Sequence, residues 1–261
     1  MDNPYILKET DDYAVVFKPV KMHCVSLKNS TSIHGVQKDN FGNLTLYDWF
    51  TAKSISVYDI MHRLDFETHG LVLFAKNEKS FIFFKNLQDN GAFIKEYSAM
   101  CSSYKIPTQA DSSNFSSGSF PNTCQSLSGF PQSPVIDYEP SNDYPFFIKS
   151  YFRPYGPGRK LVRPVINDGK KHREIAKDKG DFYITEVINI NNNNFTVQIK
   201  RGFRHQIRCH LCWAGFPILN DPLYSHEKIS SAEHLALRAH AVFFTDPSTG
   251  KPCEYRISPI C

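Results

Sequence analysis

The sequence predicts a mixed α/β (α+β) fold, in which strands alternate with a few helices. Residues 71–75 form an uninterrupted apolar run after Gly70, which is typical of a strand buried on both faces. Residues 78–90 place large apolar side chains at helical spacing. Residues 182–200 hold two apolar segments on either side of four asparagines, which predicts a hairpin. Together these three patterns require both kinds of secondary structure.

The N-terminal part of the chain is expected to hold a strand and a short helix. Residues 13–17 form a short apolar strand that ends at Lys18-Pro19. Residues 44–50 predict the helix. Its apolar side is made of Leu46, Trp49 and Phe50.

A second helix and a further strand are expected between residues 78 and 100. The helix over 78–90 carries Phe81, Phe84 and Leu87 at helical spacing, and Asn90-Gly91 is a typical stop. The strand over 93–100 has one face made of Phe93, Lys95, Tyr97 and Ala99. Aromatic residues in such positions usually face a core, so the pattern alone predicts core packing for Tyr97.

The C-terminal part is expected to form a hairpin, a third helix and two more strands. The expected elements are strands at 182–190, 195–200, 240–244 and 253–257 and a helix at 204–214. In the helix, Ile207, Leu211 and Ala214 have core spacing, and Gly215 ends it. The turn between the last two strands covers residues 246–250.

Two stretches differ in composition from the rest. Residues 102–145 are rich in Ser, Asn, Pro and Gly without sustained periodicity, so we expect a flexible insertion there. Residues 149–173 are basic, with aromatic residues between the charges and a turn at Gly156-Pro157-Gly158. Basic groups neutralise phosphates and aromatic rings stack on bases, which indicates a surface for nucleic acid; a solvated basic loop is the alternative. The basic residues are Lys149, Arg153, Arg159, Lys160, Arg163, Lys170, Lys171, His172 and Arg173.

Length and composition leave several function classes open and disfavour others. A chain of 261 residues forms one large domain or two modest ones. The net charge of +4 says little about nucleic acid, so any basic surface must be local. The 7 cysteines have no framework spacing, and the N-terminus lacks a basic segment and an apolar core. We therefore expect reduced thiols and a cytoplasmic location, and no membrane segment, because no apolar run approaches about 20 residues.

The segment before the buried run at 71–75 concentrates groups that can do chemistry. His62, Arg63 and Asp65 lie in a polar turn that leads directly into this run. A turn that precedes a buried strand holds a carboxylate rigidly at the edge of a cleft, so Asp65 is the candidate reactive group. The alternative is a weak surface ion pair between Arg63 and Asp65, with Thr68 or Asp65 capping a turn.

The helix at 204–214 also raises the question of a metal site. His205, Cys209 and Cys212 lie at i, i+4 and i+7 and would share one side of this helix, while Arg204 and Arg208 stack on a neighbouring face. A structural zinc site needs a fourth ligand, and its paired cysteines usually sit on a turn. We therefore expect buried cysteine packing, no metal and no cofactor.

Three motifs resemble those of the RluA-type RNA pseudouridine synthases. Residues 62–71, His-Arg-Leu-Asp-x-x-Thr-x-Gly-Leu, are similar to the motif of the catalytic aspartate. Residues 205–224 carry His-Gln-Ile-Arg-x-His-Leu, then Gly-x-Pro-Ile and Asp-Pro-Leu-Tyr, which is similar to the second signature. Lys95-x-Tyr97 is similar to the motif of the active-site tyrosine. The resemblance implies a largely antiparallel central sheet with a basic active-site cleft across it, and one catalytic domain over 1–261 without an N-terminal S4 domain.

The same resemblance implies roles for three catalytic residues. Asp65 is expected to act at the sugar, either as a nucleophile or as the base that removes a sugar proton. Arg208 is expected to pair with Asp65 and keep it ionised. Tyr97 is expected to stack on the detached uracil and to help the late loss of the C5 proton. Arg63 is expected to occupy the space left by the flipped-out nucleotide.

The expected partner is RNA, either rRNA or tRNA, bound by a monomer. The residues predicted to contact RNA are His62, Arg63, Thr68, Arg153, Arg159, Lys160, Arg163, Arg204 and His205. Lys18 and His23 are only weakly matched to the family, because Val20 and Lys21 replace the usual small residues.

Further departures from the family leave the assigned chemistry intact. His69 stands where serine is usual, and Phe203-Arg204 replaces the common Arg-Thr pair. Two other classes stay open. A nucleoside or glycoside hydrolase would need a second carboxylate, for which Glu67 is the near candidate. A catalytically idle RNA-binding protein on the same fold is the other.

Overall fold

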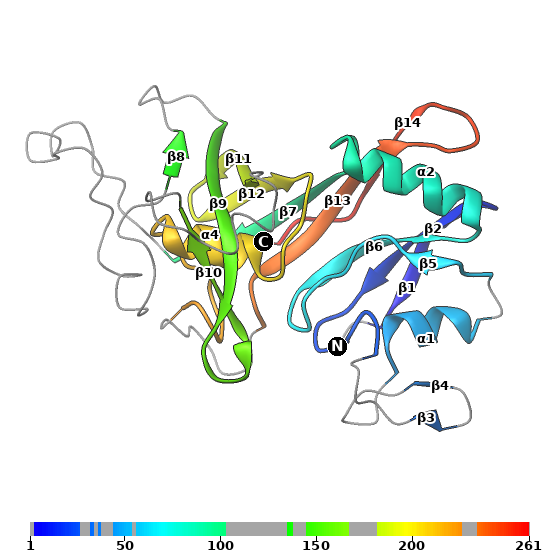
Figure 1. Cartoon of the computed structure of the whole chain (residues 1–261), viewed down its shortest axis with the longest axis horizontal. Coiled ribbons are helices and arrows are strands. Elements are labelled where there is room, and N and C mark those ends of the chain that lie inside the picture. Colours follow the sequence, from blue (N-terminus) through cyan, green and yellow to red (C-terminus); the bar gives the residue numbers. More distant parts are fainter. Residues whose placement is uncertain are drawn as a thin grey trace, which may run out of the picture. The chain divides into compact units, whose positions relative to one another are not determined.

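The computed structural model describes residues 3–26, 32–33, 36–37, 44–53, 56–102, 135–137, 145–166, 182–225 and 234–260 (Figure 1). Its strands are β1 Tyr5–Glu9, β2 Tyr13–Lys18, β3 Ser32–Ile33, β4 Val36–Gln37, β5 Asp59–Ile60, β6 His69–Ala75, β7 Ile94–Met100, β8 Val135–Asp137, β9 Phe146–Tyr155, β10 Leu161–Val165, β11 Tyr183–Asn191, β12 Asn194–Ile199, β13 Leu237–Thr245 and β14 Pro252–Arg256. Its helices are α1 Leu46–Thr51, α2 Glu78–Asp89, the short 3-10 helix η2 Pro157–Arg159, and α4 Gln206–Trp213.

The chain divides into two compact units. Unit 1 comprises Met1–Tyr97 and Leu237–Pro259, and unit 2 comprises Ser98–Ala236 and Ile260–Cys261. The strand β7 passes from unit 1 into unit 2 after Tyr97. Among the described residues, no helix combines the length and apolar character needed to cross a bilayer.

Unit 1 is a sheet covered by helices, with β6 at its centre. Its strand order is β1-β2-β6-β13-β7, with β5 paired to β6 and β14 paired to β13. The pairs β1–β2, β2–β6, β5–β6 and β13–β14 are antiparallel, whereas β6 and β13 run parallel. The expected buried strand at 71–75 is confirmed, because every residue of β6 is buried.

The two helices of unit 1 explain why β6 is buried on both faces. Leu71 and Leu73 lie in a core cluster with Phe84 of α2. On the alternate face, the ring of Phe74 lies 4.7 Å from that of Phe50 in α1. The side chains of Asn77 and Thr45 accept the N-terminal amides of α2 and α1 respectively, which fixes where each helix begins.

Unit 2 is an antiparallel sheet packed on α4. Its strand order is β7-β12-β11-β9-β10, and β8 pairs with β9. The expected hairpin at 182–200 is confirmed as β11 and β12. Cys209 and Cys212 of α4 pack in a core cluster with Phe152, Val162 and Tyr183 of the sheet.

Three elements differ from the sequence-based expectation. The strand β1 was not predicted. The basic stretch, for which no strands were predicted, forms the strands β9 and β10 around the expected turn. The last helix begins at Gln206 instead of residue 204, because His205 has a left-handed backbone with φ 57°.

Parts of two further expectations fall outside the described residues. Within the insertion expected at 102–145, the structure describes Ser102, the short strand β8 and Pro145. The other residues of this stretch lie outside the described part of the chain. The basic residues Lys170 to Arg173 are also outside the described part of the chain.

Gly70 allows β6 and β13 to approach closely. Its φ is +127°, which side chains rarely adopt, and its Cα lies opposite that of Ala239. A Cβ at this position would overlap the carbonyl oxygen of Ala239 and lie 2.6 Å from its nitrogen. Both obstacles are backbone atoms, which cannot move aside cheaply.

We expect Gly70→Ala to lower the free energy of unfolding by more than about 4 kcal/mol, because the strand pair must separate. Gly250→Ala is the matched control, since Gly250 also has a positive φ but no atom lies within 4 Å of the place that a Cβ would take there. That control should cost about 1–2 kcal/mol for the left-handed backbone alone. Denaturant titration of both variants measures the difference. Equal losses would show that close strand approach is not the constraint.

Candidate active site

The candidate carboxylate lies in the turn between β5 and β6. The amide of Thr68 donates to the carbonyl oxygen of Asp65 at 3.1 Å and closes the turn. The side chain of Asp65 is partly buried, whereas that of Arg63 is exposed. Thr68 itself is only 2% exposed. The turn is therefore held from inside, with Arg63 facing solvent.

Lys18 places a buried cation beneath this turn. Its ammonium donates to the carbonyl oxygens of Pro19 and Met22, both at 2.8 Å, and of Phe66 at 3.4 Å. Burial lowers the pKa of Lys18 to about 8, and the negative charge of Asp65 is one of the groups that oppose this shift. Lys18 therefore stays charged at neutral pH and within electrostatic reach of Asp65.

Tyr97 is brought to the same place by β7. Its side chain is buried, and its pKa is raised first by burial and then by the negative charge of Asp65. This electrostatic coupling places Tyr97 close to Asp65 although the two are far apart in sequence. The phenol consequently stays protonated over the physiological range.

Lys95 lies on the same face of β7 as Tyr97. Its ammonium sits 5.0 Å from the ring centroid of Phe93, and burial lowers its pKa to about 8. The intervening Glu96 points to the other face, where its Oε1 lies 2.7 Å from Arg256 and 2.9 Å from His240. This buried acidic group fixes the strand that carries Tyr97.

His62 and Thr68, both predicted to contact RNA, support the turn from inside. The Nε2 atom of His62 accepts the amide of Leu73 at 3.2 Å. Burial, with a smaller contribution from Lys95, lowers the pKa of His62 to about 3, so the ring is neutral. Contact of these two side chains with RNA stays a prediction.

In unit 2, the guanidinium of Arg208 is held by a buried carboxylate. Its Nε and Nη2 donate to the two oxygens of Asp221 at 2.8 Å and 2.7 Å. Asp221 Oδ1 also accepts the amides of Leu223 and Tyr224. Arg208 is 2% exposed, so this two-pronged pair fixes the plane of its guanidinium. Asp65 belongs to unit 1, and its pairing with Arg208 stays a prediction.

His205 and Arg204 lie before α4 and not on it. The prediction that Arg204 and Arg208 lie one above the other on the helix is therefore wrong. The prediction that His205 shares one side of the helix with the two cysteines is wrong for the same reason, because the helix begins only after His205. His205 Nδ1 lies 3.2 Å from the hydroxyl of Tyr224, which also donates to the carbonyl of Val162. Arg204 Nη2 donates to the carbonyl of Arg159 at 2.6 Å and ties this segment to the basic hairpin.

The hairpin of β9 and β10 presents several of the predicted RNA contacts. Arg153 and Arg163 lie directly opposite each other across the two strands. The Arg163 guanidinium lies 5.6 Å from the ring centroid of Tyr155, and Arg159 and Lys160 are exposed at the turn. Like charges directly opposite each other destabilise a strand pair. Such an arrangement is typical of a surface that meets an anion.

The cysteines of α4 behave as core residues. Cys209 donates to the carbonyl of Val162 at 3.7 Å, and Cys212 to that of Tyr224 at 3.1 Å. The expected buried packing is confirmed. Within the described residues, no group of three His, Cys, Asp or Glu side chains is arranged to hold a metal ion.

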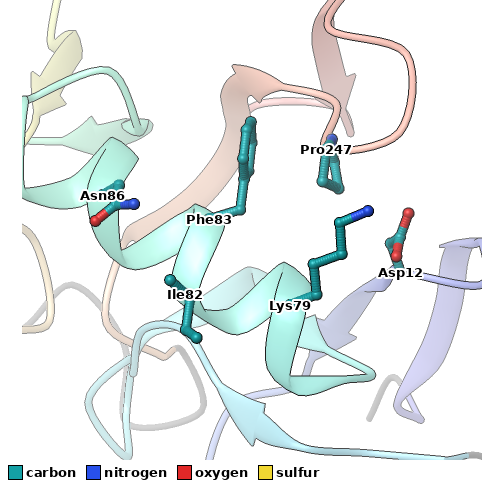
Figure 2. A pocket seen from close by; sticks show the side chains of 6 residues that line it. All are labelled: Asp12, Lys79, Ile82, Phe83, Asn86 and Pro247. Atoms are coloured by element: carbon teal, nitrogen blue, oxygen red, sulfur yellow. The ribbon is translucent and has the colours of Figure 1, made fainter.

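Unit 1 has a surface hollow that none of the predicted catalytic residues lines. It encloses about 230 Å³ between α2 and the turns at Asp12 and Pro247. Figure 2 shows Lys79 of α2 extending toward Asp12 and Pro247. None of the residues that line it is a predicted catalytic or RNA-binding residue. We therefore take the Asp65 turn as the candidate active site.

Comparison with known proteins identifies the family. The sequence profile described as RNA pseudouridylate synthase matches residues 12–213. This chain belongs to that family. Among solved structures, human RNA Pseudouridylate Synthase Domain Containing 1 superposes with a TM-score of 0.60 at 15% identity, over 98% of this chain and 83% of the other. The predicted mixed fold with a largely antiparallel sheet is thereby confirmed.

Curated relatives of this pseudouridylate synthase family member are distant but extensive. An uncharacterised RNA pseudouridine synthase of Bacillus subtilis is 25% identical over 75% of this chain and 50% of its own length. Ribosomal large subunit pseudouridine synthase C of Rickettsia prowazekii is 23% identical over 95% of this chain and 65% of its own length. The chain thus spans half to two thirds of these two relatives. The RluA-type resemblance of the motifs is confirmed.

Sequence reasoning missed two groups of this site. Cys24 of the segment after β2 lies against the Asp65 turn, and Asp221 binds Arg208. Asp221 belongs to the second signature, so the sequence marked its position. The sequence did not indicate that Asp221 pairs with Arg208. Cys24 carries no motif signal at all.

His210 is a neutral buried histidine in the family's second signature. Its Nδ1 lies 2.8 Å from Thr185 Oγ1, and its Nε2 lies 2.9 Å from Ser150 Oγ. Burial lowers the pKa of His210 to about 3, against an ordinary value of 6.5. Between these two values the unfolded chain binds a proton that the folded protein excludes. This histidine therefore makes the folded state less stable as the pH falls from 6.5 toward 3.

We expect His210→Gln to weaken the acid sensitivity of folding. One proton of difference corresponds to a slope of about 1.4 kcal/mol per pH unit. The loss of unfolding free energy between about pH 6.5 and 4.5 should therefore be about 2–3 kcal/mol smaller in the variant than in wild type. Urea titrations at the two pH values measure it, and His234→Gln, at a partly exposed position, is the control. An unchanged loss would contradict the neutral buried state of His210.

Proposed function

We propose that this chain converts uridine in RNA to pseudouridine, with Asp65 as the catalytic carboxylate. The observation that carries the proposal is the placement of Asp65, in the turn before β6, within electrostatic reach of the buried Tyr97 on β7. The family requires a carboxylate and an aromatic ring together at one nucleotide. The turn and β7 supply both.

The reaction is an isomerisation and needs no outside reactant. The bond between N1 of uracil and C1′ of ribose breaks, the uracil turns, and its C5 bonds to C1′. The proton on C5 is lost, and N1 gains one. Asp65 acts at the sugar, either by forming a transient bond to it or by removing a sugar proton. The buried Lys18 cation lies within electrostatic reach of Asp65.

Tyr97 acts through its ring more than through its hydroxyl oxygen as a base. Burial and Asp65 raise the pKa of its phenol, so a phenolate is disfavoured. A protonated, buried aromatic ring suits stacking on the detached uracil and keeps the base from escaping. Removal of the C5 proton then falls to water or another group.

Arg208 is proposed to meet Asp65 with N–H groups other than the two that Asp221 accepts. A guanidinium carries five N–H groups, so it can bind a second carboxylate beside Asp221. Because Asp221 fixes the guanidinium plane, Arg208 would also fix the direction of Asp65.

The proposed substrate is a structured rRNA or tRNA. The opposed Arg153 and Arg163 and the exposed Arg159 and Lys160 support phosphate binding along the β9–β10 hairpin. Arg204 supports this role indirectly by holding the hairpin turn. The exposed Arg63 next to Asp65 suits entry into an opened stem.

Asp65→Asn tests the proposal directly, because it keeps the side-chain shape while removing its charge. We expect pseudouridine formation to be abolished while RNA affinity changes little, since phosphate contacts dominate binding. Asp59→Asn is the matched control, an exposed aspartate that accepts the amide of Ile60. Single-turnover assays should quantify both pseudouridine and free uracil. A rate for Asp65→Asn within about tenfold of wild type contradicts the assignment, and free uracil as the main product favours a hydrolase.

The two arginines should differ in their dependence on RNA structure. Arg63→Ala should slow a stem-loop substrate about a hundredfold more than an unstructured strand, because unstacking costs a few kcal/mol only where bases are stacked. Arg208→Lys, which keeps a cation beside the buried Asp221, should slow both RNAs by a similar factor. Single-turnover rates on both RNAs at one salt concentration decide this. If Arg63→Ala shows no dependence on substrate, its role in flipping the nucleotide is wrong.

A further inference from the structure

The thiol of Cys24 forms hydrogen bonds with both the amide and the carbonyl group of Leu64, the residue before Asp65. The amide of Leu64 donates to Cys24 Sγ at 3.2 Å, and Sγ lies 3.5 Å from the carbonyl oxygen of Leu64, to which it donates. Cys24 is 4% exposed and Leu64 is 8% exposed, so water has little access to replace these bonds. One side chain thus satisfies two backbone groups that are otherwise costly to bury.

The protonation state of Cys24 suits this double role. Burial raises the pKa of the Cys24 thiol, and the charges of Lys18 and Arg63 oppose the shift only in part. A thiol can donate one hydrogen bond and accept another, whereas a thiolate can only accept. The neutral thiol is therefore the form that holds both groups of Leu64.

The segment that carries Cys24 also holds the residue after Asp65. The carbonyl oxygen of Phe66 accepts the amide of Lys21 at 2.9 Å and the ammonium of Lys18 at 3.4 Å. Residues 18–24 therefore contact the neighbour of Asp65 on each side. The peptide units 63–64, 64–65 and 66–67 are thereby fixed, which leaves the backbone at Asp65 little freedom.

The helix α1 makes this segment a rigid support. The amide of Leu46 donates to the carbonyl of His23 at 2.8 Å, and that of Tyr47 donates to the carbonyl of Cys24 at 3.0 Å. These amides belong to the first turn of α1, where no carbonyl within the helix is available to them. The N-terminal end of α1 therefore fixes the backbone at Cys24, and the Cys24 thiol in turn fixes Leu64.

We propose that Cys24 is a positioning residue that sets the location of the Asp65 carboxylate through its two bonds to Leu64. This inference rests on the proposed function for its effect on rate, but the bonds themselves can be tested without activity. A displacement of about 1 Å in a catalytic group can cost about a hundredfold in rate. Loss of the thiol should therefore lower the rate of the chemical step and leave RNA binding nearly unchanged.

Cys24→Val and Cys24→Ser separate packing from hydrogen bonding. Valine fills similar space but can neither donate nor accept, whereas serine can do both. We expect Cys24→Val to lower the single-turnover rate at saturating protein by about 10- to 100-fold. The Kd for the same RNA should stay within about threefold, and Cys24→Ser should keep the rate within about fivefold of wild type. Cys101→Val is the control, a second buried cysteine, which belongs to unit 2.

Hydrogen exchange of the Leu64 amide gives a readout that needs no substrate. This amide should exchange faster in Cys24→Val than in wild type or Cys24→Ser, while amides within β6 stay protected in all three. Rates are compared per folded molecule, so a loss of stability alone does not count. If Cys24→Val fails to fold, Cys24→Ala removes the same two bonds without adding a branched side chain.

Two results would overturn the proposal. One is a Cys24→Val rate per folded molecule equal to that of wild type. The other is an unchanged exchange rate at Leu64, which would mean that the thiol does not hold this residue. If wild type forms no pseudouridine in any RNA tested, the proposed function fails, and the exchange of Leu64 alone then decides whether Cys24 is the support.

Discussion

The close approach of three strands at Gly70 is the constraint on which unit 1 depends. Lys18 of β2 lies opposite Gly70 on one side, and Ala239 of β13 lies opposite it on the other. This register brings the end of β2, and with it the Lys18 ammonium, to the turn that carries Asp65. A side chain at position 70 would overlap the backbone of Ala239 and separate β6 from β13. The strand that follows the Asp65 turn therefore depends on a glycine at this position.

Within each unit, buried polar groups hold the predicted catalytic residues. Asp221 fixes Arg208 in unit 2, while Lys18 and Cys24 fix the backbone beside Asp65 in unit 1. Each of these groups has a carboxylate, carbonyl or amide within hydrogen-bonding distance, which is how such groups can be buried without a prohibitive cost. The same burial lowers the pKa of the lysines and keeps the phenol of Tyr97 protonated.

Local patterns predicted those parts of the structure that depend on neighbours in sequence. The apolar run of β6, the aromatic spacing of α2 and the asparagine turn before β12 all formed as expected. Motifs pointed to Asp65, Tyr97 and Arg208. The bond between Cys24 and Leu64 could not be foreseen, because it joins distant residues and has no periodicity. The left-handed backbone of His205 could not be predicted either, because a histidine side chain does not indicate a positive φ.

The opposed arginines of the β9–β10 hairpin link folding to the ionic surroundings. Arg153 and Arg163 lie opposite each other across the two strands, so a polyanion can contact both at once only when the hairpin is folded. By mass action, a ligand that favours the folded state raises the melting temperature whether or not it carries a target uridine. Heparin, bulk RNA and polyphosphate should therefore all give a thermal shift. A screen that measures only the melting temperature would rank these polymers by charge density. It would not identify the RNA sequence that the protein modifies.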